Sequence, residues 1–226
     1  FEDLATCVKT FFNVDGTQLE PGEFRGQIKF IAGRDILLYR ENYSHRTHLE
    51  CELLGKQFGF SIPLLTAEGK FLGEPVDDKI TPSSVSGETF DHVMERGFEQ
   101  LIVLLDHERL LKIAEQAGLA DSALEAISPE RKWKALKTRP SDIQSIRQNC
   151  TTMLSAVIGG EMNLSVDEFE KVIFDSVLPM IDSGEYRMDR HSSAILVRRA
   201  IDIWEANPGP MGVSELSTTL NASPRT

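Results

Sequence analysis

The sequence has 226 residues and a formal net charge of −11, with 41% hydrophobic and 26% charged residues. This composition is ordinary for a globular chain of one or two domains, and no apolar run approaches the ~18 residues of a membrane span. The negative charge argues against nucleic acid or an anionic membrane as the main partner of this stretch. Three dispersed cysteines and no signal-peptide pattern predict a cytoplasmic location, without a zinc site or disulfides.

Alternating side chains predict an antiparallel sheet in the first half of the chain. Apolar or aromatic residues recur at every second position in the segments 26–30, 58–62 and 89–94, between turn signals such as Glu68-Gly69. The run LIVLL at 101–105 lacks this alternation, which is typical of a central strand buried on both faces. Several short strands at close spacing predict a small β-barrel or sandwich.

The periodicity changes after Asp106, a candidate N-cap residue. An apolar stripe with helical spacing follows at 110–117, and Gly118 stands where a glycine commonly follows a helix. From there the chain is predicted to be helical, with a last helix at about 193–207. A sheet followed by helices predicts an α+β fold with a boundary near residue 106.

Two capping boxes are predicted in the helical part. Ser141 with Gln144 fits the first and Ser165 with Glu168 fits the second, since each serine precedes a glutamine or glutamate by three residues. Pro179 is expected to kink or end the second of these helices, because proline cannot donate the backbone hydrogen bond.

A cupin-like metal-dependent enzyme is one alternative for the barrel, because histidines on barrel strands can ligate iron, manganese or zinc. The segment SHRTHLE offers His45, His48 and Glu50, but on an ideal strand the two histidines face opposite sides. His48 and Glu50 share a face, and two ligands do not make a catalytic site. His92 either lines a pocket or is a satisfied, half-buried histidine. Because no phosphate-binding loop, nucleophile elbow or dinucleotide motif occurs, the sequence predicts neither an enzyme nor a cofactor.

The last segment of the sequence has the pattern of a helix-turn-helix. The amphipathic stretch 195–207 is followed by a Pro/Gly link and by a short helical pattern at 213–220, in which two leucines would face a core. Ser217 is small enough for a close helix crossing, and Asn221 tolerates the left-handed conformation of a turn. Serine and proline at 223–224 are suited to begin the next helix.

Taken together, RRAIDIWEAN and VSELSTTLNASPRT resemble the start of the DNA-binding domain of AraC/XylS-type transcriptional regulators. The chain has Ser217, Asn221 and Ala222 where that family usually has alanine, glycine and valine. The stretches QLEPGEFRGQIKF, DILLYRENYSHRTHLECELLGKQFGFSIPL and ETFDHVMERGFEQLIVLLDHERLLKIA are similar to the sensor domain of regulators related to the ethanolamine-utilisation regulator. The resemblance covers most of the chain and is looser in the sensor half.

The resemblance implies a β-barrel, cupin-like sensor domain at 1–106, a helical linker and dimerisation region at 107–190, and an incomplete helix-turn-helix domain at 191–226. It implies a bacterial regulator that binds DNA through the full-length protein, forms a homodimer and responds to a small-molecule effector, with no membrane partner. The recognition helix would begin at Ser223, so the sequence is expected to stop inside it. Four arginines balance four acids from position 189 onward, so the charge of −11 belongs to the sensor and linker.

Candidate residues follow for each role. The start of the helix-turn-helix comprises Val213, Ser214, Glu215, Leu216, Ser217, Thr218, Thr219, Leu220, Asn221, Ala222, Ser223, Pro224, Arg225 and Thr226. The candidate ligand-binding residues are Tyr39, Arg40, Tyr43, Phe58, Phe60 and His92. The candidate dimer seam is Met153, Val157, Phe169 and Val172, with helix packing inside one chain as the equal alternative. A regulator whose barrel binds a protein instead of a small molecule is a further alternative.

Overall fold

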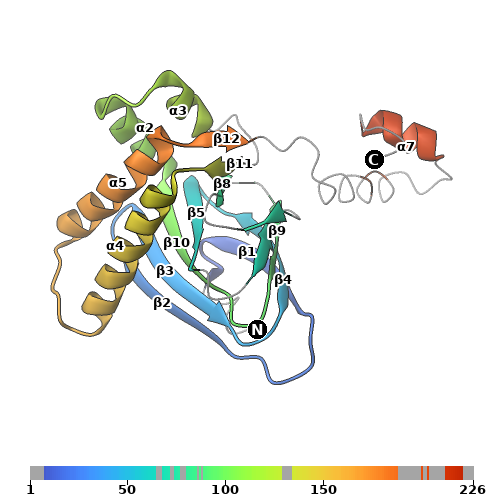
Figure 1. Ribbon diagram of the computed structural model, residues 1–226, viewed down its shortest axis with the longest axis horizontal. Helices are drawn as coiled ribbons and strands as arrows, with labels where there is room; N and C mark the ends of the chain where they lie inside the picture. The colour runs from blue at the N-terminus through green and yellow to red at the C-terminus, as the bar shows by residue number, and fades with distance from the viewer. Residues whose placement is uncertain are drawn as a thin grey trace.

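The computed structural model describes residues 8–64, 68–71, 74–76, 80–85, 87, 89–128, 134–187, 200, 203 and 212–220. Within these residues the chain forms two antiparallel sheets and a group of helices, which is the α+β organisation predicted from the sequence (Figure 1).

The smaller sheet has five strands, all from the first hundred residues. In spatial order they are β1 (Phe12–Gln18), β4 (Thr47–Leu53), β9 (Thr89–Met94), β6 (Gly69–Phe71) and β7 (Glu74–Pro75). The register of its centre pairs Cys51 of β4 with Val14 of β1 on one side and with Phe90 of β9 on the other.

The larger sheet has seven strands. In spatial order they are β12 (Glu185–Arg187), β11 (Lys134–Lys137), β8 (Ile80–Val85), β5 (Gln57–Pro63), β10 (Glu99–Asp106), β3 (Ile36–Tyr43) and β2 (Gly26–Ala32). The expectation of an entirely helical chain after Asp106 was wrong, because β11 and β12 lie in that region and extend the sheet next to β8. Short strands of this kind gain their stability from pairing with a neighbouring strand, which local periodicity does not reveal.

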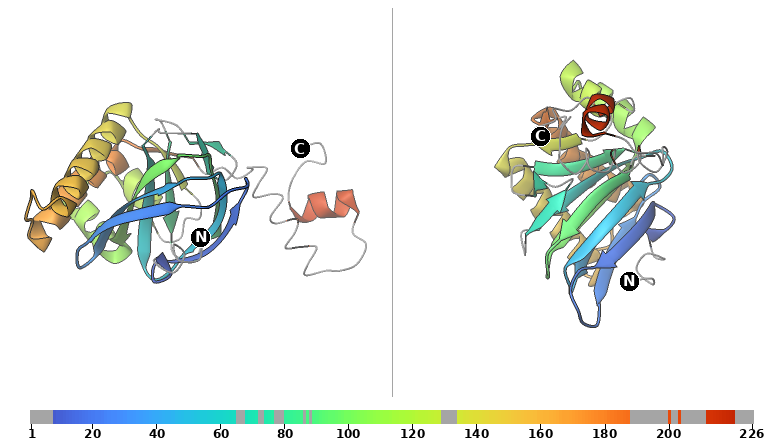
Figure 2. Two further views of the ribbon diagram at one scale, coloured as in Figure 1. Left: turned by 90° about the horizontal axis from the view of Figure 1, so that it is seen from below. Right: turned by 90° about the vertical axis from the view of Figure 1, so that its right-hand side faces the viewer.

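The described helices are α2 (His107–Gln116), α3 (Asp121–Ala126), α4 (Pro140–Ile158), α5 (Val166–Asp182) and α7 (Val213–Thr219). Helices α2 to α5 lie together against one side of the sheets (Figures 1 and 2). Among the described residues, no helix combines the length and the apolar character that a membrane crossing requires.

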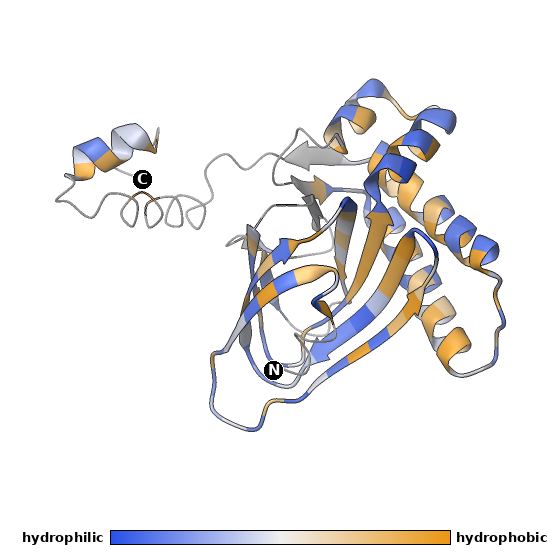
Figure 3. Cartoon of the chain, turned by 180° about the vertical axis from the view of Figure 1, so that it is seen from behind, coloured by the Kyte–Doolittle hydropathy of each residue, from blue (hydrophilic) through white to orange (hydrophobic). Residues whose placement is uncertain are grey.

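The larger sheet is the middle layer of the molecule and is buried on both faces. On β10, Leu101, Val103 and Leu105 belong to the core shared with the helices, whereas Ile102 and Leu104 belong to the core between the two sheets. Figure 3 accordingly shows the central strands as mostly hydrophobic and the helices as mixed. The prediction of a central strand at 101–105 is confirmed. Each fully buried aliphatic or aromatic side chain of these cores contributes roughly 1.5–3 kcal/mol of transfer free energy.

The helix ends confirm some sequence predictions and correct others. The Asp106 side chain accepts a hydrogen bond from the Arg109 backbone N–H at 2.8 Å, and Gly118 adopts φ 72° after α2. Ser165 and Glu168 form the predicted capping box. The box predicted at Ser141 was wrong: the N-cap residue of α4 is Arg139, two residues earlier, with proline at the first helical position and no side-chain cap.

Helix α5 does not end at Pro179 but continues to Asp182. The expected termination was wrong because the flanking residues Val177, Met180 and Ile181 are buried in the helix-side core. Packing of that apolar face outweighs the single backbone hydrogen bond that proline removes.

A buried carboxylate ties α5 to α2 and to the turn between β2 and β3. Glu170 is 1% exposed and accepts hydrogen bonds from the Arg109 guanidinium at 2.7 Å and from the backbone N–H groups of Arg34 at 2.7 Å and Asp35 at 3.2 Å. Burial alone would raise the pKa of this carboxyl group, but these donors more than offset it, so its pKa is lowered. The helical layer is therefore fastened to the sheet by a carboxylate whose charge is matched within the chain.

Candidate ligand-binding cavity

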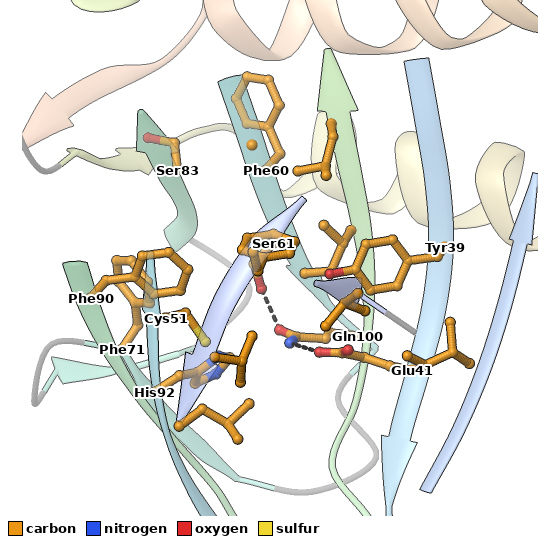
Figure 4. Close-up of a pocket in the computed structure, with 18 of the residues that line it drawn as sticks. Tyr39, Glu41, Cys51, Phe60, Ser61, Phe71, Ser83, Phe90, His92 and Gln100 are labelled. Carbon is orange, nitrogen blue, oxygen red and sulfur yellow. Dashed lines mark hydrogen bonds between the residues drawn. The ribbon is translucent and has the colours of Figure 1, made fainter. Parts of the chain in front are cut away.

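A cavity of about 50 Å³ lies between the two sheets (Figure 4). This is more than one water molecule needs and far less than a drug-sized ligand requires. Most of its wall consists of side chains from β1, β3, β4, β9 and β10 that alternate with residues facing outward or toward the helices, and β2, β5, β6 and β8 supply most of the remainder. On β5, Gly59 and Ser61 are on the cavity side, while Phe58, Phe60 and Ile62 belong to the helix-side core, and of these three Phe60 also borders the cavity.

The polar part of the wall is a short chain of hydrogen bonds on the larger sheet. The Ser61 hydroxyl donates to the Gln100 side-chain carbonyl, and the Gln100 amide donates to Glu41 at 2.5 Å (Figure 4). The Tyr43 hydroxyl donates to the other carboxyl oxygen of Glu41 at 3.0 Å. Gln100 lies directly opposite Glu41 in the register of β10 and β3, so the strand pairing itself creates this contact.

Glu41 is 5% exposed and has no cationic partner among the described lining residues. Burial raises the pKa of its carboxyl group, and the hydrogen bonds from Gln100 and Tyr43 lower it by less. The neighbouring cation, Arg40, is on the opposite face of β3, where its guanidinium pairs with Glu99. The carboxyl group in the cavity therefore has hydrogen bonds but no counter-charge from the part of the chain that the structure describes.

His92 forms the polar part of the wall on the smaller sheet. Its ring is 3% exposed and lies edge-on to the rings of Phe71 and Phe98, and its Nε2 atom has no hydrogen-bond partner among the described residues. Burial lowers the pKa of His92 to about 4, so the imidazole is neutral near pH 7. An unpartnered buried nitrogen is costly, and it is available to a molecule inside the cavity.

The thiol and the phenol groups of the wall are uncharged near neutral pH. Burial raises the pKa of the Cys51 thiol, so this lining thiol stays protonated and is a poor nucleophile. Burial also raises the pKa values of Tyr39 and Tyr43 well above the ordinary tyrosine range, which leaves their hydroxyls uncharged. The cavity is therefore suited to hold a small molecule by hydrogen bonds and apolar contact.

Four of the six residues predicted to contact a ligand line this cavity, namely Tyr39, Tyr43, Phe60 and His92. Arg40 and Phe58 do not: Arg40 faces away, and the Phe58 ring packs against His107 at 5.4 Å between ring centroids. Reasoning from the sequence missed Glu41, Ser61 and Gln100. Glu41 stands between two tyrosines at period-two spacing, which is the signal that places it on their face.

The residues of the metal-site alternative are divided between different surfaces. His48 and Glu50 lie on the outer face of the smaller sheet, where one donor atom of each and one of Asp91 are within 4.8 Å of one another. His92 is on the inner face. The His45 ring fills the space beside Gly22, whose φ is 133°, so a Cβ at that glycine would stand 2.3 Å from the imidazole. His48, Glu50 and Asp91 could together hold a metal ion, but they lie outside the cavity.

The predicted dimer residues lie on α4 and α5 with different exposure. Met153 and Phe169 are buried in the helix-side core, and Val157 packs against that core. Val172 is 36% exposed. In the predicted helix-turn-helix, α7 covers Val213–Thr219, which matches the expected first helix, whereas positions 221–226 lie outside the described residues.

Comparisons with known proteins reveal a shared fold. No protein-family model matches the sequence, and no curated protein is significantly similar to it. The crystal structure of the AraC-like transcriptional activator CuxR matches 100% of this chain and 81% of that chain, with a TM-score of 0.56 and 13% sequence identity. An apo variant of ToxT from Vibrio cholerae strain SCE256 matches 90% of this chain and 72% of that chain, with a TM-score of 0.41 and 6% identity. ToxT from Vibrio cholerae O395 matches 88% and 70%, with a TM-score of 0.34 and 8% identity.

Proposed function

We propose that this chain is the signal-sensing and dimerisation part of a sequence-specific, DNA-binding transcriptional regulator of the AraC type. The observation that carries the proposal is the cavity between the two sheets, where the His92 Nε2 atom has no hydrogen-bond partner among the described residues, in a fold shared with an AraC-like activator. The sensor comprises 1–106, the linker 107–190 and the start of the DNA-binding domain 191–226. The protein acts in the cytoplasm and has no catalytic role.

Strand β10 provides a physical connection between the cavity and the helices. Its residues alternate between the two cores, so Ile102 and Leu104 line the cavity while Val103 and Leu105 contact the helical side. The strand ends at Asp106, and that residue caps α2. A ligand that displaces β10 would thus shift the helices, provided that it binds the two arrangements with different affinity.

Self-association is assigned to the outer side of α4 and α5. Val172 is the most exposed of the four predicted seam residues, and the exposed apolar residues Ile158, Met162 and Val166 lie at the connection between the two helices. Met153 and Phe169 support this surface from beneath. DNA contacts are assigned to the segment Val213–Thr226, in which α7 is the first helix of the motif.

Two measurements test the proposed function. Native mass spectrometry of the chain, purified without chelator, is expected to reveal a dimer without metal and, where the cavity is filled, a small-molecule adduct. Selection of bound DNA from random duplexes by the full gene product is expected to enrich one sequence motif. A monomer together with no enriched motif would contradict the proposal.

A metal-dependent domain is the second candidate, and the cluster of His48, Glu50 and Asp91 is the observation that favours it. One histidine and two carboxylates are ligands that zinc, manganese and iron accept. The cluster lies on the outer face of the smaller sheet, apart from the cavity, which disfavours catalysis in an enclosed site. One transition-metal ion per chain, lost in His48→Ala, would support this candidate.

A further inference from the structure

The two cavity walls define which chemical class of molecule fits between them. Resting on the proposed sensing function, we infer that the effector of this cavity is a compact organic cation, an ammonium group on an apolar body, whose charge pairs with Glu41. The inference specifies the chemistry of the ligand and follows from the composition of the wall.

Glu170 reveals how this chain stabilises a buried carboxylate for which it supplies all partners. There the Arg109 guanidinium donates at 2.7 Å and two backbone N–H groups donate to the same carboxylate. Glu41 is 5% exposed, and among the described residues its hydrogen-bond donors are the neutral side chains of Gln100 and Tyr43. A buried acid without a cation is costly when ionised, so a cation supplied from outside would gain the full benefit of pairing with it.

The remainder of the wall suits the body of such a ligand. Aromatic side chains line much of the cavity, including Phe12, Tyr39, Phe71 and Phe90. Aromatic faces attract ammonium groups electrostatically and bury apolar carbon equally well. The neutral imidazole of His92 adds a hydrogen-bonding nitrogen, Nε2, that has no partner among the described residues.

Anionic ligands are disfavoured by the same wall. The described lining residues include no lysine or arginine, and Arg40 is turned to the other face of β3. A carboxylate or phosphate in the cavity would therefore lie near Glu41 without a compensating charge. A neutral ligand could fill the space, but it would leave Glu41 without a counter-charge.

The pairing predicts a characteristic pH dependence. The titratable groups that line the cavity with Glu41 are Tyr39 and Tyr43 from its own strand, Cys51 from β4 and His92 from β9. Near neutral pH these four are uncharged, so Glu41 is the group whose ionisation controls the binding of a cation. As the pH increases toward the raised pKa of Glu41, the affinity for an ammonium ligand should rise by up to tenfold per pH unit. Above that pKa the affinity should level off.

A matched set of probes tests the inference on the whole 226-residue chain. The probes are n-butylammonium, n-butanol and butyrate, which are unbranched molecules of four carbon atoms each and differ in charge. Binding is followed by NMR chemical shifts of the cavity methyl groups. We expect n-butylammonium to bind at least tenfold more tightly than n-butanol, and butyrate to bind most weakly.

The variant Glu41→Gln keeps the size and hydrogen-bonding capacity of the side chain and removes its charge. It should lose the preference for n-butylammonium while binding n-butanol at least as well as the wild type, which also proves that the cavity is intact. Glu108→Gln, at an exposed position on α2, is the matched control and should change neither affinity.

The inference is overturned if n-butanol or butyrate binds as tightly as n-butylammonium, if Glu41→Gln keeps the preference, or if none of the probes shifts the cavity resonances. The first two results would leave the sensing function standing with a ligand of another class. Failure of the proposed function would instead appear as the absence of a DNA motif for the full gene product, whichever probe binds.

Discussion

Two carboxyl groups on opposite sides of the same sheet have opposite surroundings. Glu170, beneath α5, is held by Arg109 and two backbone amides, and its pKa is lowered. Glu41, between the sheets, is held by Gln100 and Tyr43, and its pKa is raised. Both residues have little solvent exposure, 1% and 5%, but Glu41 lies deeper in the protein, so its raised pKa reflects stronger burial as well as the lack of a cationic partner among the described residues.

This difference separates a structural role from a binding role. On the helix side, each buried polar group described above has partners supplied by the chain, and the apolar core around it is continuous. On the cavity side, Glu41 lacks a cation and the His92 Nε2 atom lacks a hydrogen-bond partner among the described residues. Groups left incomplete in this way reduce stability and are commonly found where a ligand completes them.

The largest effect on stability is expected when Glu170, on the helix side, loses its nearest cationic partner. Arg109→Met removes the nearer counter-charge of Glu170 and should destabilise the fold by about 1.5–3 kcal/mol near neutral pH, since Arg34, at 3.7 Å, and two backbone N–H groups remain beside the carboxylate. Lys56→Met is the control, because the pair Lys56–Glu108 is exposed and screened by water and should contribute far less to stability. Urea unfolding measures the free energy of unfolding of both variants. Equal losses of stability would contradict the expectation that the buried pair matters more than the exposed one.

The free energy of unfolding should decrease at acid pH because His92 is buried in its neutral form. Its pKa falls from 6.5 to about 4 in the fold, so the unfolded chain binds an additional proton between these values. The stability contribution is therefore complete above about pH 6.5 and is lost as the pH falls, amounting to about 3 kcal/mol by pH 4. The variant His92→Phe should lack this contribution to the slope of stability against pH. An unchanged slope in that variant would place the proton uptake elsewhere.

Glu41 should produce the opposite pH dependence. Because its folded-state pKa is raised, its contribution is present at low pH and is lost as the pH rises through that pKa, at about 1.4 kcal/mol per pH unit. Glu41→Gln should flatten the stability profile between the ordinary glutamate pKa and the raised pKa of Glu41. A ligand that carries a positive charge should flatten it in the wild type as well, since it stabilises the ionised form.

The smallest expected effect compares two serines that fit the same sequence pattern. Ser165→Ala removes an observed capping box and should cost about 1 kcal/mol, whereas Ser141→Ala should change the free energy of unfolding by less than about 0.5 kcal/mol. Thermal unfolding measures the stability of the two variants, and equal losses would contradict the assignment of a cap to Ser165 alone.

The alternation of apolar residues was sufficient to predict the layered core. The unbroken run at 101–105 marked the central strand, and Gly118 and Ser165 marked helix ends correctly, because these signals depend on neighbours within a few residues. Ser141 failed as a cap because Pro140 already occupied the first helical position. Strands β11 and β12 were not predicted, since they exist through pairing with β8 from a distant part of the chain.

The cavity could be predicted only in part. Tyr39, Tyr43 and His92 follow from the alternation of their strands, but Phe58 has the same pattern and faces the helices instead, because β5 is covered by helices on that side. Glu41 and Gln100 become a pair only through the register of β3 with β10. Sequence spacing also placed His48 and Glu50 on one face, while the third member, Asp91, came from the neighbouring strand.

The most direct test of the contrast is a titration of the side-chain carboxyl carbons of Glu41 and Glu170 by ¹³C NMR in the ligand-free chain. The account predicts that Glu41 titrates above the ordinary glutamate range and Glu170 below it, and that n-butylammonium lowers the pKa of Glu41 alone. If both carboxyl groups titrate below that range without ligand, Glu41 already has a counter-charge within the chain, and the assignment of the cavity to an organic cation is contradicted.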